Sequence, residues 1–350
     1  MEYRDYADRI VPQASNVMGG LLLLVLLTGN FFFLSHGNNA MEGAHAGFSP
    51  FFSSWLATFD LHSVWAIVAS SVLVLAICVL MIWMNEVFSF ISVRTILPAF
   101  FFVVFASLMM RPSAFNISYI LALLAATTLF SCFHEKAEHE KPTHLFLIGM
   151  LVGIQTLISV SCLTYIIVLF PYFYQIRSLS LRTTIAFLIG LFLPFLYAFL
   201  CSVCVASAQG SSDALAVSAD AWANHFRGWK VYGDRTLFQG MTLAARIYFG
   251  FFAGLSIFSA FRAFVSSASQ TVKNRLQTLF ITFLFFWTLV LFLMGVSDAV
   301  LLLPSLLCLG AFLMGQYLSV EYNVATKIVW VIFLLSSLLY YIFPDYNYMG

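Results

Sequence analysis

The chain has 350 residues, of which 62% are hydrophobic and only 9% are charged, and its mean hydropathy is +0.95. Soluble domains carry about 25% charged residues, so this composition excludes an ordinary soluble globular protein. The net charge of +1 comes without a basic stripe, which argues against a nucleic-acid partner. All six cysteines fall in apolar runs, and Cys201-x-x-Cys204 lacks the βαβ context of a redox motif.

Apolar runs of about 20 residues are long enough to cross a bilayer as helices. They predict an all-α, polytopic membrane helix bundle with about 11 transmembrane helices, because backbone amides in hydrocarbon must be paired within each segment. The whole chain, 1–350, is expected to form a single integral membrane domain. The expected spans are 15–35, 63–84, 96–110, 117–132, 144–158, 160–175, 183–207, 240–261, 277–296, 299–317 and 326–343.

The first span is expected to stay uncleaved, because its apolar run is longer than a signal-peptide core of about 7–15 residues. Residues 1–14 then form a cytoplasmic segment. The stretch 144–175 is short for two crossings, and its crossing number decides the orientation of everything downstream. Two crossings leave most Lys and Arg residues inside, so the positive-inside rule favours a hairpin of two short crossings. This places the N-terminus in the cytoplasm and the C-terminus outside.

Two long connections, 36–62 and 208–239, are then expected on the outer face. The first carries Glu42 and Asp60 and contains no Lys or Arg. The second is the basic one, and its cations are Arg227, Lys230 and Arg235. An acidic loop and a basic loop sharing one face is the pattern that most favours chemistry there.

The connection 208–239 also contains apolar residues at helical spacing, which predict an amphipathic helix starting near Ser212 or Asp213. The expected apolar stripe is Leu215, Ala219, Trp222, Phe226 and Trp229, and the expected polar face is Ser218, Asp220, Asn224 and His225. Indole rings favour the headgroup layer, so Trp222, Phe226 and Trp229 are expected to anchor this helix at the outer interface. A lid that grips a substrate is the alternative.

Three further polar features have their own interpretations. Arg246, two turns into its span, either extends back to the headgroups or joins the outer cations in binding a lipid phosphate or another anion. The run 134–141 is interpreted as a solvated turn, because its histidines lack a third ligand, and no metal or cofactor is expected. Asp298, at an outer tip between two spans, is interpreted as a helix-capping residue.

Several segments between Asn85 and about Val205 carry a resemblance to known families. They are the basic start 94–98, the hairpin segment 146–154, the basic turn 177–182 and the segment 190–194. This pattern resembles a family of uncharacterised multi-pass bacterial inner-membrane proteins. It is also similar to the GT-C glycosyltransferases, which use polyprenyl-phosphate sugars. That similarity implies Asp60 or Glu42 as the catalytic carboxylate and Arg227, Lys230 or Arg235 as phosphate contacts.

The sequence therefore predicts a multi-pass protein of a bacterial cytoplasmic membrane, in contact with membrane lipids and serving cell-envelope biogenesis. Three function classes stay open. They are a non-catalytic component or assembly partner, a lipid-linked glycosyl or phosphoryl transferase with a polyprenyl-phosphate lipid as partner, and a transporter of lipids or small molecules. The expected spans lack the paired acidic residues of an ion relay, which disfavours ion-coupled transport.

Overall fold

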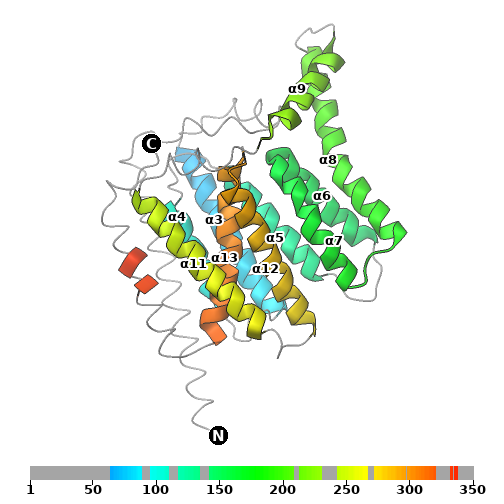
Figure 1. Cartoon of the computed structure of the whole chain (residues 1–350). Coiled ribbons are helices and arrows are strands. Elements are labelled where there is room, and N and C mark those ends of the chain that lie inside the picture. Colours follow the sequence, from blue (N-terminus) through cyan, green and yellow to red (C-terminus); the bar gives the residue numbers. More distant parts are fainter. Residues whose placement is uncertain are drawn as a thin grey trace, which may run out of the picture.

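The computed structural model describes residues 64–88, 95–109, 117–134, 142–208, 213–230, 243–266, 272–296, 298–320, 332–333 and 335–337. The elements in these ranges are helices (Figure 1). They are α3 (Val64–Phe88), α4 (Leu97–Met109), α5 (Ser118–His134), α6 (Pro142–Ile158), η2, a 3-10 helix (Val160–Tyr165), α7 (Ile166–Gln175), α8 (Leu181–Ala208), α9 (Ala214–Gly228), α11 (Leu243–Ser266), α12 (Val272–Leu293) and α13 (Ala299–Val320).

The expected spans between 63 and 317 each coincide with one of these helices, except 160–175, which is divided into η2 and α7, and their ends are displaced by little more than one turn. Five helices are long and apolar enough to cross a membrane, namely α3, α8, α11, α12 and α13. The other apolar helices, α4, α5, α6 and the segment 160–175, have 10–17 residues. The predicted all-helical architecture with several apolar candidate spans is therefore confirmed for the described residues, whereas span 15–35 and most of 326–343 lie outside them.

Helix α13 is the centre of the bundle. Almost all of its residues are buried, and it packs against α4, α5, α11 and α12 (Figure 1). Two glycines let neighbours approach closely. A Cβ at Gly310 would lie 2.5 Å from the Phe252 ring, and one at Gly315 would lie 2.6 Å from the Pro98 ring. Small residues at helix contacts are typical of membrane bundles, where packing replaces the hydrophobic effect between helices.

Helices α6 and α8 form an unusually close pair, and they run in the same direction. Cβ atoms added at Gly149, Gly153 or Gly190 would come within 3.0 Å of the backbone of the facing helix. Gly149 faces Phe187 and Gly153 faces Leu191, so the contact advances the same way along both helices. A parallel pair requires the chain to reverse twice between them. The intervening η2–α7 segment therefore returns in the opposite direction, as a hairpin over 144–175 requires.

The geometry of the return segment, residues 160–175, explains how so few residues reach a length close to the thickness of a bilayer's hydrocarbon core. The ten residues of α7 span about 15 Å. The six residues of η2 rise about 2.0 Å each and add about 12 Å. The sum, about 27 Å, approaches the roughly 30 Å thickness of a bilayer's hydrocarbon core. The 3-10 winding thus makes the segment 160–175 longer than a continuous α-helix of the same residues would be.

The bundle has two ends, which we call the Asp298 end and the basic end. The Asp298 end holds the C-terminal ends of α6, α8 and α12 and the start of α13. The basic end holds the C-terminal end of α7 and the starts of α8 and α12. Its exposed cations are Arg177, Arg182, Lys273 and Arg275. In Figure 1 the Asp298 end is at the top and the basic end at the bottom.

Helix α9 folds back on the end of α8 (Figure 1). It rests there on Ser218 and Trp222, which are 3% and 7% exposed, and the Trp222 indole donates to the Ser202 hydroxyl at 3.2 Å. Leu215, by contrast, is exposed. The predicted place of Ser218 on the polar face is therefore wrong, because Ser218 lies one turn before Trp222 on the face that packs against α8. The place of Leu215 on a lipid-facing apolar stripe stays a prediction. The interfacial position of α9 stays a prediction.

Candidate functional site

A buried carboxylate joins two distant parts of the chain at one end of the bundle. Among the described acidic residues, Asp298 alone is buried, with 4% of its surface exposed. It accepts hydrogen bonds from the Ser159 hydroxyl, from the Ser161 hydroxyl at 2.5 Å and from the Ser161 backbone N–H at 3.1 Å. A carboxylate removed from water is costly unless donors compensate it, and here three donors do so.

The interpretation of Asp298 as a helix cap is only half right. Its backbone carbonyl accepts from the Leu301 N–H at 3.0 Å, as expected one residue before α13. Its side chain, however, turns away from α13 and binds the turn between α6 and α7. It therefore ties the start of the central helix to the hairpin.

The local sequence explains why the two serines meet Asp298. Helix α6 ends at Ile158, and Ser159 takes an extended conformation before η2 begins. The Ser159 carbonyl accepts from the Cys162 N–H at 3.0 Å, which closes the first turn of η2. The 3-10 turn thus brings Ser159 and Ser161 to the same carboxylate. Both serines are fully buried, so the cluster is shielded from water.

Trp229 and Trp287 extend this polar cluster in two directions. The Trp229 indole, just past α9, donates to the Ser161 hydroxyl at 2.9 Å. The Thr164 hydroxyl donates to the Ser161 carbonyl at 2.6 Å and accepts from the Trp287 indole on α12 at 2.9 Å. A continuous set of hydrogen bonds therefore runs from the end of α9, through the hairpin turn, to α12.

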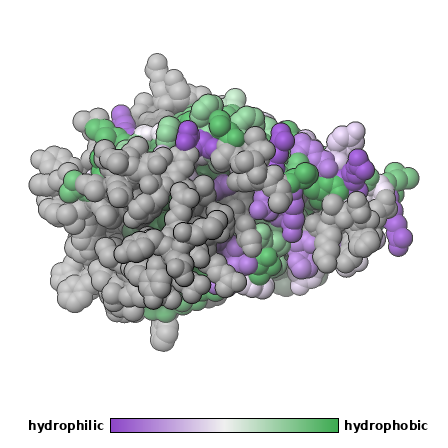
Figure 2. Space-filling view, turned by 90° about the horizontal axis from the view of Figure 1, so that it is seen from below, coloured by the Kyte–Doolittle hydropathy of each residue, from purple (hydrophilic) through white to green (hydrophobic). Residues whose placement is uncertain are grey.

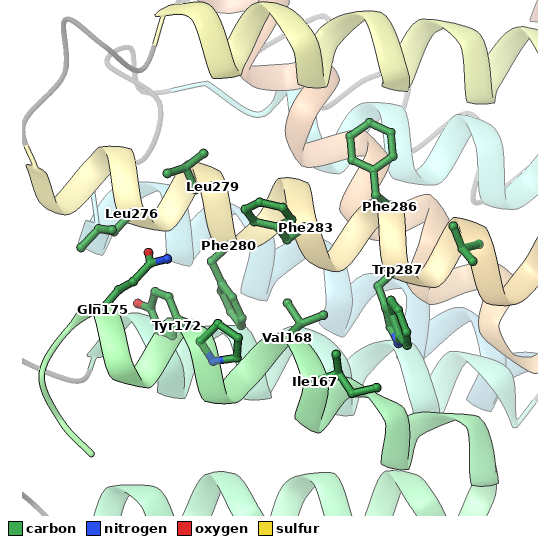
Figure 3. A pocket seen from close by; sticks show the side chains of 12 residues that line it. Ile167, Val168, Tyr172, Gln175, Leu276, Leu279, Phe280, Phe283, Phe286 and Trp287 are labelled. Carbon is green, nitrogen blue, oxygen red and sulfur yellow. The ribbon is translucent and has the colours of Figure 1, made fainter. Parts of the chain in front are cut away.

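Trp287 also lines a groove between α7 and α12, with a volume of about 360 Å³ (Figure 3). Its walls are almost entirely apolar, and Ile167 and Phe283 are each 58% exposed, so the groove opens to the side of the bundle. The Tyr172 ring stacks on Phe280 at 4.2 Å and forms part of the inner wall. Such a groove can receive a hydrocarbon chain from the membrane.

The predicted outer-face cations are at the Asp298 end, on two different helices. Arg227 and Lys230 are exposed at the end of α9, and Arg246 is exposed in the first turn of α11. Arg246 does not point into the bundle interior. Glu42, Asp60 and Arg235 lie outside the described residues. The predicted meeting of acidic and basic loops therefore stays a prediction.

The predicted anchors have specific positions. Trp222 is buried against Phe195 and Ala198, and Phe226 remains 41% exposed. Trp229 is half-buried and belongs to the Asp298 cluster. Their role as anchors in the headgroup layer stays a prediction. Within the described ranges, no group of three or more His, Cys, Asp or Glu side chains could hold a metal ion.

Sequence reasoning missed both the Asp298 cluster and the groove. A signal for the first was present, because Ser159 and Ser161 interrupt an apolar run and Asp298 is the sole acidic residue between Gln277 and Ser319. Their contact spans more than 130 positions, which no local pattern encodes. The groove depends on how two helices diverge, which is not visible in either helix alone.

No known protein family, curated protein or solved structure matches this chain. The resemblances to an inner-membrane family and to GT-C enzymes therefore remain hypotheses. The functional argument rests on the geometry of the Asp298 cluster and of the groove between α7 and α12.

Proposed function

We propose that this chain is a multi-pass protein of a bacterial cytoplasmic membrane, with about 11 spans, which binds a lipid or lipid-linked molecule and serves cell-envelope biogenesis. The observation that carries this proposal is the groove between α7 and α12 (Figure 3). Its volume of about 360 Å³ lies within the range of about 300–1,000 Å³ typical of small-molecule sites. Its apolar walls favour a hydrocarbon chain as the bound group.

The Asp298 cluster supports this function as a clamp on the groove rather than as a reacting group. The carboxylate is buried and fully occupied by serine donors. Through Thr164, the cluster fixes the Trp287 indole at one end of the groove. Rigid walls lower the entropy cost of binding, because fewer side chains must be ordered when the ligand enters. The class of function best supported is therefore lipid binding without chemistry.

A GT-C-like transferase is the second candidate, and the exposed Arg227 and Lys230 favour it. Lys230 directly follows Trp229, which binds the Asp298 cluster. A polyprenyl chain in the groove would place its phosphate toward this end, where cations stabilise the departing phosphate. Asp60 or Glu42 would then take the proton from the acceptor hydroxyl. This candidate predicts that neutralising both carboxylates abolishes transferase activity.

The test of lipid binding uses the full chain in lipid nanodiscs with a phospholipid that carries a photoactivatable diazirine in its acyl chain. We expect cross-links concentrated on the groove-facing residues of α7 and α12. The variant Val168→Trp fills the groove, because Val168 is one of its lining residues, and should reduce that labelling several-fold. The matched control is Ile189→Trp, which adds the same ring at an exposed position on α8.

Two results would contradict the proposal. The first is labelling of the exposed apolar face of α8 at the same density as the groove, which would reduce the groove to ordinary lipid-facing surface. The second is unchanged groove labelling in a folded Val168→Trp protein. Circular dichroism and size-exclusion profiles of each variant establish that the protein compared is folded.

A further inference from the structure

We infer that the groove selects an anionic phospholipid, whose acyl chain lies between α7 and α12 and whose phosphate is held at the basic end by Arg177 and Arg275. This inference rests on the proposed lipid binding and names the ligand class. It is carried by the position of these two cations relative to the groove. It also assigns a direction to the bound lipid, with its headgroup away from Asp298.

The two arginines mark one end of the groove. Gln175 and Leu276 both line it, so the C-terminal end of α7 lies beside the N-terminal end of α12 (Figure 3). Arg177 follows Gln175 by two residues, and Arg275 immediately precedes Leu276. Arg275 is also one helical turn before the lining residue Leu279, so it lies toward the same side of α12. Both arginine side chains are exposed and available to a headgroup.

The turn that presents Arg177 is held by hydrogen bonds. Arg177 has a φ of 54°, which side-chain-bearing residues rarely adopt. The next residues secure it: the Ser178 N–H donates to the Phe173 carbonyl at 3.1 Å, and the Thr183 hydroxyl donates to the Ser178 carbonyl at 2.9 Å. Ser178 and Thr183 are both buried. The cation therefore projects from a fixed turn, which favours a defined contact over diffuse attraction.

The electrostatics at this end favour a phosphate. Helices α8 and α12 both begin here, and helix N-termini carry partial positive charge. Lys273, two residues before Arg275, adds a further cation. Figure 2 views this end of the molecule, and hydrophilic side chains gather there on the half where α7 ends and α8 and α12 begin. Guanidinium groups bind phosphate oxygens in a bidentate manner. In a zwitterionic lipid, the ammonium group partly neutralises the charge of the phosphate, so its attraction to the arginines is weaker.

The other end of the groove is less suited to a phosphate. It is lined by Ile167, Val290 and the Trp287 indole, whose N–H is already used by Thr164. Arg227 and Lys230 flank Trp229, which bonds to Ser161, and neither cation is a neighbour in the chain of a lining residue. Among the described residues, the basic end therefore offers cations close in the chain to lining residues, and the Asp298 end does not.

The experiment compares two diazirine lipids with the same acyl chains, phosphatidylglycerol and phosphatidylcholine, on the full chain in nanodiscs. We expect phosphatidylglycerol to label the groove preferentially, with each arginine contributing about five-fold at low salt. The double variant Arg177→Gln/Arg275→Gln should bring the preference close to one, while phosphatidylcholine labelling stays unchanged. Arg182→Gln is the control, since it removes the same charge at the same end from a helix that does not line the groove.

The possible outcomes separate this inference from the proposed function. If neither lipid labels the groove, because another segment of the chain fills it, the proposed function fails and this inference fails with it. If both lipids label the groove equally in the unmodified protein, lipid binding stands and the anionic selectivity is refuted. If the preference is lost on neutralising Arg227 and Lys230 instead, the headgroup lies at the Asp298 end and our orientation is wrong.

Discussion

The close pairing of α6 and α8 makes a sharp prediction about Gly190. In Gly190→Ala, the new Cβ would overlap the Phe146 carbonyl oxygen and come to 3.1 Å from the Met150 backbone nitrogen. Backbone atoms cannot rotate away as a side chain does. The two helices must therefore move apart by roughly 1 Å to restore an ordinary van der Waals contact. That movement also loosens the neighbouring contacts of Gly149 and Gly153.

The expected magnitude follows from two opposing terms. Overpacking a tight interface costs about 1–3 kcal/mol, occasionally more. Alanine gains up to about 1 kcal/mol over glycine in a helix interior. The control Gly254→Ala has the stabilisation of alanine in a helix without the cost of overpacking, because a Cβ at Gly254 meets nothing within 4 Å. We therefore expect Gly190→Ala to be about 1–3 kcal/mol less stable than Gly254→Ala.

The assay is reversible unfolding in mixed micelles at increasing SDS fraction, followed by tryptophan fluorescence and circular dichroism. A free energy of unfolding for Gly190→Ala equal to that of Gly254→Ala would refute the close parallel packing of α6 and α8. An intermediate value in Gly153→Ala is consistent with it, since part of the clash there is with the Pro194 ring.

Two further variants test the Asp298 cluster. Asp298→Asn should lower the free energy of unfolding by about 1–3 kcal/mol, since an amide has only one oxygen with which to accept hydrogen bonds from the two serines. Unfolding in SDS measures this free energy. Unchanged stability would mean that the carboxylate does not hold the hairpin. Trp229→Phe keeps the ring packing and loses the donor to Ser161, so it should cost only about 1 kcal/mol. Hydrogen–deuterium exchange of backbone amides should then rise in η2 while α3 stays protected. Equal exchange of η2 in Trp229→Phe and in the unmodified protein would argue against a stabilising bond between Trp229 and Ser161.

Much of the helical fold could be predicted because a membrane removes ambiguity. Any long apolar run must form a helix there, so the run itself locates the element. One of the two largest end errors has a clear cause: α12 begins at Val272, whereas the expected span begins at Gln277. Lys273 and Arg275 are polar but good helix formers, so the helix continues beyond its apolar part.

The site was less predictable, because it depends on contacts between distant residues. The parallel approach of α6 and α8 relies on Gly149 and Gly190 being in register, which a sequence shows only after the direction of both helices is known. The facing of α9 was misjudged for a related reason. Its polar face was expected to include Ser218, but Ser218 is buried against α8, because the neighbouring helix decides which side of α9 is covered.

The central position of α13 has a consequence for how the protein is made. This helix begins at residue 299 and leaves the ribosome after α4, α5, α11 and α12, the described helices that pack against it. Helices α4, α5, α11 and α12 are therefore complete in the chain before their common partner exists. The contacts of α13 with these helices, and the contact of Asp298 with the hairpin serines, can therefore form only late in synthesis.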